Sequence, residues 1–382
     1  MKQKKIINKK LFDLRRELHQ HPELSGNEKQ TSERIIKFIS QFKPDETITG
    51  LGGHGVAFIF KGKQKGPSIL FRSDLDALPI EETNDFNYKS VNNKVSHTCG
   101  HDGHMTILAG LAAEISITPN AKGNIILLFQ PAEETGQGAR LVLKDKKFEK
   151  IKPDYVFALH NLPEYNKHNI LVRNNSFAAA SKGMVIKLFG KTSHAGEPEK
   201  GLNPAKATAR IMERLINLPK INMLFRDFVL LTIIHVSLGE IAFGTSPGYA
   251  EIRATIRANK NRDMKVLTKE AESLVARITS EEKLKFEISY TEDFSAVENN
   301  REAVRYIKTS AKENKYKLQI MPAAFRWSED FSHFTNRYKG AMFGLGAGVD
   351  TPKLHNPDYD FPDEIIETGI NMFSSIYKNI LK

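Results

Sequence analysis

The sequence predicts an α/β fold in which the chain of one domain is interrupted by a second, smaller domain. Three observations support this prediction. Short apolar runs alternate with helical patterns in the first and last parts of the chain, the middle part has a different order of elements, and polar side chains follow several apolar runs. The 382 residues are enough for two domains, because one domain usually takes about 100 to 200 residues.

The first and last parts of the chain predict a twisted sheet flanked by helices. Residues 11–21 and 27–42 have the pattern of amphipathic helices, and a helix rich in small residues is expected over 103–116. The apolar runs are short and almost uninterrupted, as expected for strands that are buried on both faces. They span residues 56–60, 69–71, 124–129, 155–159 and 341–345.

The middle of the chain predicts a ferredoxin-like domain. Its elements follow the order strand, helix, strand, strand, helix, strand, which is the signature of that fold. They span residues 184–189, 203–217, 228–236, 249–258, 263–280 and 284–290. Because the earlier pattern returns after residue 291, we expect residues 179–291 to be inserted into a first domain formed by residues 1–178 and 292–382. His235 lies among apolar neighbours in one of these strands, and we expect it in the core.

Composition excludes several classes of protein. With 40% hydrophobic and 26% charged residues, the chain is neither a disordered protein nor a membrane bundle. The net charge is +11, but the lysines are scattered without aromatic residues between them, so we expect a solvated basic surface and no binding to nucleic acid or membrane. Residues 11–17 form a charged amphipathic pattern instead of the apolar core of a signal peptide, and we expect a cytoplasmic protein.

Polar residues follow the predicted strands at the edge where ligands of open α/β sheets collect. The candidates are Asp74 and Asp76 after the run 69–71, Cys99 and His101 before the helix at 103, Glu133 and Glu134 after the run 124–129, His160 at the end of the run 155–159, and His355 after the run 341–345. Buried acids, imidazoles and thiols are costly to desolvate unless they are paired or bind a metal. A metal site would account for all of them together.

These residues favour a site with two metal ions. Cys99 and His101 lie two positions apart around Gly100, so both side chains can reach one ion. The candidate ligands are Cys99, His101, Glu134, His160 and His355. Five ligands exceed the three that hold a single catalytic zinc, but they fit two ions about 3.5 to 4 Å apart. In the pair Glu133 and Glu134, one carboxylate can bind metal while the other acts as general base toward the attacking water, and spacing does not decide between them.

Two other interpretations stay open at this point. Cys99, the only cysteine of the chain, could be the nucleophile of an amidase that forms a thioester. The chain could also be a non-enzymatic protein that binds a metal or another ligand. His97 and His104 flank the same cluster, and we expect them to support the ligands rather than to bind metal.

Several motifs resemble those of a known enzyme family. In chain order they are SDLDALP at 73–79, HTCGHDGH at 97–104, QPAEE at 130–134, SHAG at 193–196, SEDFS at 328–332 and HNPDYDF at 355–361. Together they resemble the hippurate hydrolase and N-acyl-amino-acid amidohydrolase family of di-metal peptidases, which includes the plant auxin-conjugate hydrolases. The resemblance covers nearly the whole chain after the first ten residues.

The resemblance implies a catalytic domain of aminopeptidase-like architecture, interrupted by a lid domain that often dimerises. It implies that Glu133 is the general base and that Asp76 orients a group at the metal. His194, in the inserted domain, resembles a lid histidine that stabilises the oxyanion, in some relatives from the partner subunit. The implied metal ligands are Cys99, His101, Glu134, His160 and His355. We therefore expect a homodimer formed through the inserted lid domain.

The expected function is hydrolysis of the amide bond in N-acyl amino acids or related small conjugates, with two divalent metal ions as the cofactor. A thiolate beside imidazoles favours zinc, the resemblance makes manganese a candidate, and cobalt or nickel would also suit these donors. One stretch departs from the family, because residues 244–247 read GTSP where relatives commonly carry Asn-Val-Ile-Pro. This chain therefore lacks that Asn at this stretch, together with any substrate contact that the Asn makes in relatives.

Overall fold

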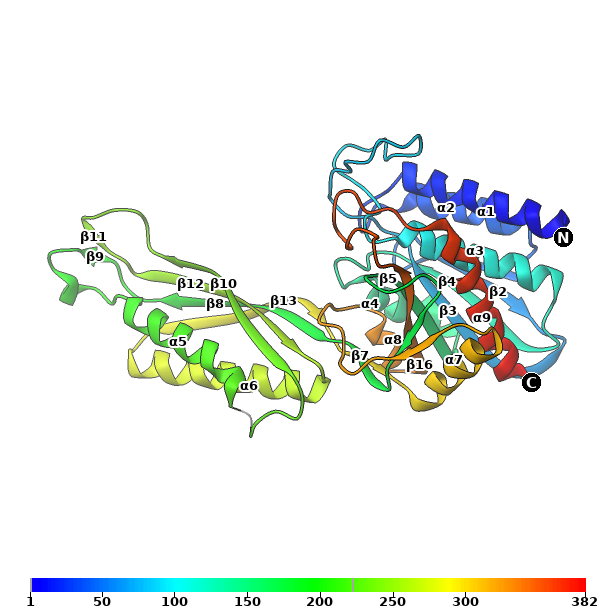
Figure 1. Ribbon diagram of the computed structural model, residues 1–382. Helices are drawn as coiled ribbons and strands as arrows, with labels where there is room; N and C mark the ends of the chain where they lie inside the picture. The colour runs from blue at the N-terminus through cyan, green and yellow to red at the C-terminus, as the bar shows by residue number, and fades with distance from the viewer. Residues whose placement is uncertain (1, 222) are drawn as a thin grey trace. The chain divides into compact units, whose positions relative to one another are not determined.

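The computed structural model describes residues 2–221 and 223–382, and the chain divides into two compact units (Figure 1). The first unit comprises Met1–Phe177, Val297–Ala323 and Glu329–Lys382, and the second comprises Ala178–Ala296 and Ala324–Ser328. The second unit is larger than the predicted inserted domain of residues 179–291, because it extends to Ala178 and Ala296 and includes the separate segment Ala324–Ser328. Strand β13 (Lys285–Phe294) continues past residue 291, and the N–H of Ala179 lies 3.0 Å from the carbonyl oxygens of both Phe325 and Trp327.

Within the described residues, the first unit is built on an eight-stranded sheet. In the order in which they pair, the strands are β1 (Glu46–Leu51), β2 (Gly55–Lys61), β4 (Lys122–Gln130), β3 (Gln64–Asp74), β5 (Tyr155–Pro163), β16 (Lys339–Gly348), β6 (Ile170–Val172) and β15 (Leu318–Ile320). The central strands β4, β3, β5 and β16 are parallel, whereas β2 is antiparallel to β4 and β6 is antiparallel to β16. All five predicted apolar runs lie within strands of this sheet, so the α/β fold class is confirmed.

Helices flank this sheet (Figure 1). They are α1 (Lys2–Gln20), α2 (Lys29–Ser40), α3 (His101–Ile117), α4 (Gly138–Lys144), α7 (Arg301–Glu313), α8 (Ser332–Thr335) and α9 (Ile366–Leu381). Helix α3 is buried along most of its length and contacts α1, α9 and β3. Small residues permit this burial, because a Cβ atom at Gly110 would lie 2.2 Å from the Cδ1 atom of Ile370 in α9.

Short elements complete the chain. They are the strands β7 (Asn175–Ala178), β9 (Ser193–His194), β11 (Thr245–Ser246) and β14 (Val297–Asn299), and the 3-10 helices at Lys146–Lys150, Pro198–Lys200, Leu218–Lys220 and Asp363–Ile365. Strand β9 pairs with β11, and β7 pairs with β14. Among the described helices, none has the length and the apolar character needed to cross a membrane.

The second unit has the ferredoxin-like order that the sequence predicts. Along the chain its main elements are β8 (Ala180–Phe189), α5 (Ala205–Asn217), β10 (Val229–Leu238), β12 (Tyr249–Ala258), α6 (Asn261–Glu281) and β13. The strands form an antiparallel sheet in the order β10-β12-β8-β13. Helices α5 and α6 pack against this sheet, and Ile186, Ile252 and Leu267 are among the buried residues of the resulting core.

Strand β10 lies at one edge of this sheet, and its pairing shows that the predicted position of His235 is wrong. Its pairing with β12 shifts between Ile233 and His235, which makes Ile234 the extra residue of a β-bulge. His235 then pairs with Arg253, whose side chain is exposed. Because directly paired residues lie on the same face of a sheet, His235 is exposed as well, and its predicted place in the core is wrong.

Candidate metal centre

The predicted metal ligands come together at the carboxyl ends of the parallel strands of the first unit. Glu134 follows β4, His160 lies in β5, and His355 follows β16. Cys99 and His101 stand where α3 begins. Parallel strands end at one edge of a sheet, so residues that are far apart in the sequence meet at that edge.

The donor atoms of these five residues form two overlapping groups. Cys99, His101 and His160 form one group, and Cys99, Glu134 and His355 form the other, with the donor atoms of each group within 4.8 Å of one another. The Sγ atom of Cys99 is 3.6 Å from Nε2 of His160. Oε1 of Glu134 lies 3.7 Å from Nε2 of His101 and 3.9 Å from Nε2 of His355. Cys99 thus belongs to both groups.

Two of the imidazoles are oriented with Nε2 toward these groups. Nδ1 of His101 lies 2.9 Å from the backbone oxygen of Asp76, and Nδ1 of His160 lies 2.8 Å from that of Asn161. A carbonyl oxygen only accepts hydrogen bonds, so Nδ1 of each ring carries a proton, and Nε2 is the nitrogen that can bind a metal. A hydrogen bond of this kind fixes the orientation of a metal-binding imidazole.

The chemistry of the cluster fits a divalent cation. Nε2 of His101 and Oε1 of Glu134 are buried and make no hydrogen bond within the described part of the chain. Burial raises the pKa of Glu134 to about 7, since the effect of nearby His101, which lowers this pKa, does not outweigh burial and the charge of Asp76. Buried donors that lack partners, in a cluster rich in carboxylates, are what a bound metal would satisfy and neutralise.

Left-handed turns present the key side chains of this site. Gly100, Ala132 and His355 have φ angles of 87°, 53° and 67°, and each of them is a candidate ligand or lies next to one or to Glu133. At Gly100 a side chain is excluded, because a Cβ atom there would lie 2.7 Å from the side-chain Nδ2 atom of Asn161. The N–H of His355 donates to the carbonyl of Thr98 at 2.9 Å, which ties the last loop to the segment that carries Cys99.

Glu133 lies beside the metal-type donors, with its carboxylate within 4.8 Å of the donor atoms of His101 and Glu134. Its Oε1 accepts a hydrogen bond of 3.4 Å from the N–H of Asp330. Burial and the neighbouring carboxylates Glu329 and Glu134 raise the pKa of Glu133 well above its usual value. A carboxyl group with a raised pKa binds a proton more readily than an exposed one, as a general base requires.

Asp76 contacts the candidate ligands through its carboxylate. Its Oδ2 accepts hydrogen bonds from the hydroxyl of Ser25 at 2.6 Å and from the N–H of Glu134 at 3.0 Å. Its Oδ1 lies 3.5 Å from Nδ1 of His101. These are contacts that would orient Glu134 and His101.

His97 and His104 differ in their surroundings. Nδ1 of His104 lies 2.7 Å from Asp74, and Nε2 of His104 contacts the side-chain oxygen of Asn161, so both ring nitrogens have partners. His97 is buried, and burial lowers its pKa to about 4. Neither ring nitrogen of His97 makes a hydrogen bond to a described residue.

His194 belongs to the second unit, where its side chain is exposed. It lies on β9 and pairs with Thr245 of β11, and its Nδ1 accepts a hydrogen bond of 3.0 Å from the N–H of Gly196. The N–H of Ala195 donates to the carbonyl of Gly244 at 2.9 Å. The stretch 244–247, which departs from the family pattern, therefore packs directly beside His194.

Sequence patterns did not identify Arg72 as part of the site. Its side chain is fully buried, with Nη1 2.8 Å from Asp74 and Nη2 2.9 Å from Glu329 and 2.6 Å from Asp330. The sequence signal that could have identified Arg72 is its position, because a positively charged residue directly follows the apolar run 69–71. The carboxylates that meet this charge come from distant parts of the chain, so their number could not be read from the sequence.

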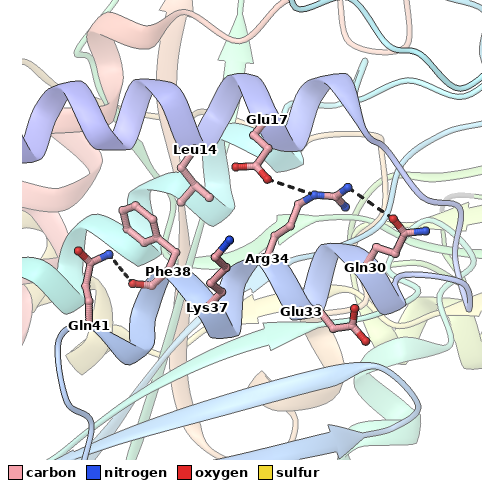
Figure 2. A pocket seen from close by; sticks show the side chains of 8 residues that line it. All are labelled: Leu14, Glu17, Gln30, Glu33, Arg34, Lys37, Phe38 and Gln41. Atoms are coloured by element: carbon pink, nitrogen blue, oxygen red, sulfur yellow. Dashed lines mark hydrogen bonds and ion pairs between the residues drawn. The ribbon is translucent and has the colours of Figure 1, made fainter.

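A groove between α1 and α2 shares no residue with this cluster (Figure 2). It has a volume of about 400 Å³, and Figure 2 shows Arg34 between Glu17 and Gln30. Arg34 lies 3.5 Å from the side-chain oxygens of both of these residues. Arg34, the positive charge at the centre of this view, therefore already contacts two neighbours of the groove.

Comparison with known proteins agrees with this chemistry. The chain is 29% identical over 371 residues to the hippurate hydrolase of Campylobacter jejuni, covering 97% of this chain and 96% of that protein. It is 28% identical over 377 residues to the N-acetyldiaminopimelate deacetylase of Bacillus pumilus, covering 98% of each. A crystal structure from Bacillus subtilis, described as a dinuclear metal binding peptidase from the M20 family, matches with a TM-score of 0.86 and 24% identity over 99% of both chains.

A family profile agrees with these similarities. The profile of peptidase family M20/M25/M40 matches residues 70–379, which is most of the chain and contains the candidate ligands. Together with the hydrolase relatives, this match shows a metal-dependent amidohydrolase that acts on amide bonds. The chain belongs to peptidase family M20/M25/M40.

Proposed function

We propose that the chain hydrolyses the amide bond of N-acyl amino acids or of related small conjugates. The observation that carries this proposal is the cluster of metal-type donors beside the buried carboxyl group of Glu133. The names of the relatives support the substrate class, since they are a hippurate hydrolase and an N-acetyldiaminopimelate deacetylase. The acyl group and the amino acid would be selected by the shape of the pocket.

We assign two divalent ions to this site, held by Cys99, His101, Glu134, His160 and His355. Cys99 belongs to both donor groups and would be shared between them. Bound ions of this kind lower the pKa of water and polarise a carbonyl oxygen. Zinc suits the thiolate and imidazole donors, manganese is the other principal candidate, and cobalt or nickel would also fit.

Glu133 would hold and move the proton of the reaction. Its carboxylate would accept a proton from the attacking water and later return it to the nitrogen of the leaving amine. The N–H of Asp330 orients Oε1 of Glu133, and Arg72 in turn holds Asp330. Asp330 and Arg72 are both fully buried, so their contacts would hold the carboxylate of Glu133 in a fixed orientation.

Two further residues complete the proposed machinery. Asp76 would orient Glu134 and His101 through the contacts described above. His194 would donate a hydrogen bond to the substrate carbonyl oxygen as negative charge develops on it. This assignment of His194 rests on the resemblance of the SHAG motif at 193–196.

We also propose a homodimer formed through the second unit. Within the described residues, the outer edge of β10 has no pairing strand. Ile234 and Leu238 on this strand are 61% and 40% exposed. An exposed apolar edge strand is a template for pairing with another chain, and a second copy would present the same edge.

Metal removal tests the enzymatic proposal. The protein would be stripped with a chelator and reloaded with Mn²⁺, Zn²⁺, Co²⁺ or Ni²⁺, and each form assayed on a panel of N-acetyl and N-benzoyl amino acids. We expect hydrolysis to disappear in the stripped protein and to return with metal. If no substrate of the panel is cleaved by any metal form, the proposed substrate class is wrong.

The same experiment tests the alternative in which Cys99 is a nucleophile. A thioester mechanism needs no metal, so hydrolysis that survives the chelator would replace the proposal. The surroundings of the thiol argue against this alternative. Burial raises the pKa of Cys99 well above its usual value, and the nearby charge of Glu134 adds to the effect. A thiol of high pKa is a weak nucleophile.

A further inference from the structure

We propose that Glu28 is a positioning residue that fixes the direction of Glu133 and Glu134. Glu28 lies just before α2, far from Glu133 and Glu134 in the sequence. It belongs to none of the motifs that identify the site. The inference rests on the proposed function, because that function assigns Glu133 as the base and Glu134 as a metal ligand.

The carboxylate of Glu28 is fully buried and contacts the turn that precedes the base. Its Oε1 accepts a hydrogen bond of 2.8 Å from the N–H of Ala132 and another of 2.8 Å from the N–H of Gly26. Its Oε2 is buried and makes no hydrogen bond to a described residue. Because a buried carboxylate is costly without hydrogen bonds, the two N–H contacts determine where this side chain lies.

Ala132 is the residue on which Glu28 acts. Its φ angle of 53° lies in the left-handed region, which is unfavourable for a residue with a Cβ atom and is therefore sensitive to loss of the contacts that hold it. The carbonyl of Ala132 accepts hydrogen bonds from the N–H groups of Gln137 and Gly138, at 3.3 and 3.0 Å. Glu28 holds the opposite side of the residue, its N–H. Relaxation of Ala132 to an ordinary φ would redirect the chain that continues into Glu133 and Glu134.

The same N-terminal segment holds a second loop of the site. The hydroxyl of Ser25 donates to Asp76, and the same oxygen of Asp76 accepts the N–H of Glu134. The segment 25–28 therefore contacts two loops with its side chains: Ser25 donates to the Asp76 carboxylate after β3, and the Glu28 carboxylate accepts the backbone N–H of Ala132 after β4. Glu134 is held from both directions, and Glu28 supplies the contact that acts through the backbone.

Metal affinity measures this role without reference to turnover. Binding of Zn²⁺ to the stripped full-length protein would be followed by calorimetry for wild type, Glu28→Ala and Glu28→Gln. Loss of a group that orients a metal ligand commonly costs about tenfold to a hundredfold in affinity, and we expect this loss for Glu28→Ala. The amide oxygen of Gln can still accept both N–H bonds, so Glu28→Gln should stay within about threefold of wild type.

Glu23→Ala is the matched control. Glu23 is an acid of the same segment, but its carboxylate accepts hydrogen bonds from the backbone and the hydroxyl of Thr31, at 2.7 and 2.8 Å. Its removal should change stability and leave zinc affinity as it is. Equal losses of affinity for Glu23→Ala and Glu28→Ala would show a general loosening of the segment and would overturn the positioning role.

A rescue experiment distinguishes positioning from simple support of the fold. Glycine adopts the left-handed region without strain, so Ala132→Gly should restore most of the affinity lost in Glu28→Ala. Lys315 is the control, since it is exposed and has a left-handed φ of 59° after α7. Lys315→Gly should add stability but restore no affinity. Rescue by both glycines, or by neither, would overturn the proposal.

Further outcomes keep the inference separate from the proposed function. If Glu28→Ala does not fold, Glu28→Asp withdraws the carboxylate from Ala132 while keeping its charge, and should lose affinity in the same way. If zinc binding depends on Glu28 but the protein cleaves no N-acyl amino acid, the proposed function is wrong and the positioning role stands. If the protein hydrolyses the amide with equal kcat and equal zinc affinity in wild type and Glu28→Ala, the proposed function stands and the positioning role is wrong.

Discussion

The two units of this chain place their groups in opposite ways. In the first unit, charged side chains such as Arg72, Asp76 and Glu133 are buried where the central strands end. In the second unit, Ile234 on the edge strand and Phe243 in the loop after it are exposed. Charged groups rarely lie inside a protein, and large apolar groups rarely gather outside it, unless something binds them. The buried charges around Glu133 mark the proposed chemistry, whereas the exposed apolar residues of the edge strand mark a proposed contact.

The buried carboxyl of Glu133 provides the largest expected effect. Glu133→Gln removes the proposed base but keeps the size of the side chain and its contact with the N–H of Asp330. We expect kcat to fall about 10²- to 10⁴-fold, because that is the usual contribution of a general acid or base. The measurement is the turnover of an N-acyl amino acid, with metal content as the control. Near-normal turnover at full metal content would exclude Glu133 as the base.

The buried cation Arg72 can be compared with an exposed one in the second unit. Arg72→Met leaves the carboxylates of Asp74, Glu329 and Asp330 buried without their shared positive charge, and should lower the free energy of unfolding by about 3 to 5 kcal/mol. Arg253, which is 52% exposed and paired with Glu251, is the control. Arg253→Met should cost less than about 1 kcal/mol. Denaturant unfolding of both variants checks this, and similar losses would remove the distinction between the two environments.

The buried histidine His19 adds a dependence on pH. Its Nδ1 lies 2.8 Å from Asp102 and its Nε2 lies 3.1 Å from Glu82. Burial alone would lower the pKa of His19, but the hydrogen bonds to these carboxylates outweigh burial and raise the pKa from 6.5 to about 9. The folded protein thus holds this proton more tightly than the unfolded chain does. The stabilisation is complete below pH 6.5 and disappears as the pH rises through 9.

Unfolding of wild type and His19→Gln across this pH range measures the effect. The difference in the free energy of unfolding should shrink by roughly 3 kcal/mol as the pH rises. Tyr88→Phe is the control, because Tyr88 packs against His19 but its pKa is raised to about 12, outside the range. Curves of wild type and His19→Gln that stay parallel would show that His19 carries no extra proton in the folded state.

The exposed edge of β10 provides the smallest effect on stability. Ile234→Lys places a charge on the bulged, exposed residue of the edge, so the free energy of unfolding of one copy should change by less than about 0.5 kcal/mol. The same charge should oppose edge-to-edge pairing, and light scattering should show a shift from dimer to monomer. Exposed Ile117, at the end of α3, offers a control in the first unit. A dimer that persists in Ile234→Lys but not in Ile117→Lys would move the interface to the first unit.

Much of the fold was predictable because its signals are local. The strands β2, β4, β5 and β16 are short apolar runs, and the order of elements in the second unit follows from their periodicity. Strands β6 and β15 escaped prediction because they are three residues long and take their place from pairing with neighbours. His235 was misplaced because a bulge at Ile234 turned it to the exposed face, and a bulge has no reliable signal in the sequence.

The sequence by itself determined which candidate donors this protein has and that they lie near the ends of buried strands or at the start of a helix, because residue type and the ends of elements are local properties. Only the tertiary structure decided that Cys99 belongs to two donor groups, that Arg72 meets three carboxylates, and that Glu28 holds Ala132. Each of these contacts joins segments that are distant along the chain. The geometry of these contacts depends on the pairing of strands and the packing of helices. The hydrophobic pattern within a single segment therefore cannot predict it.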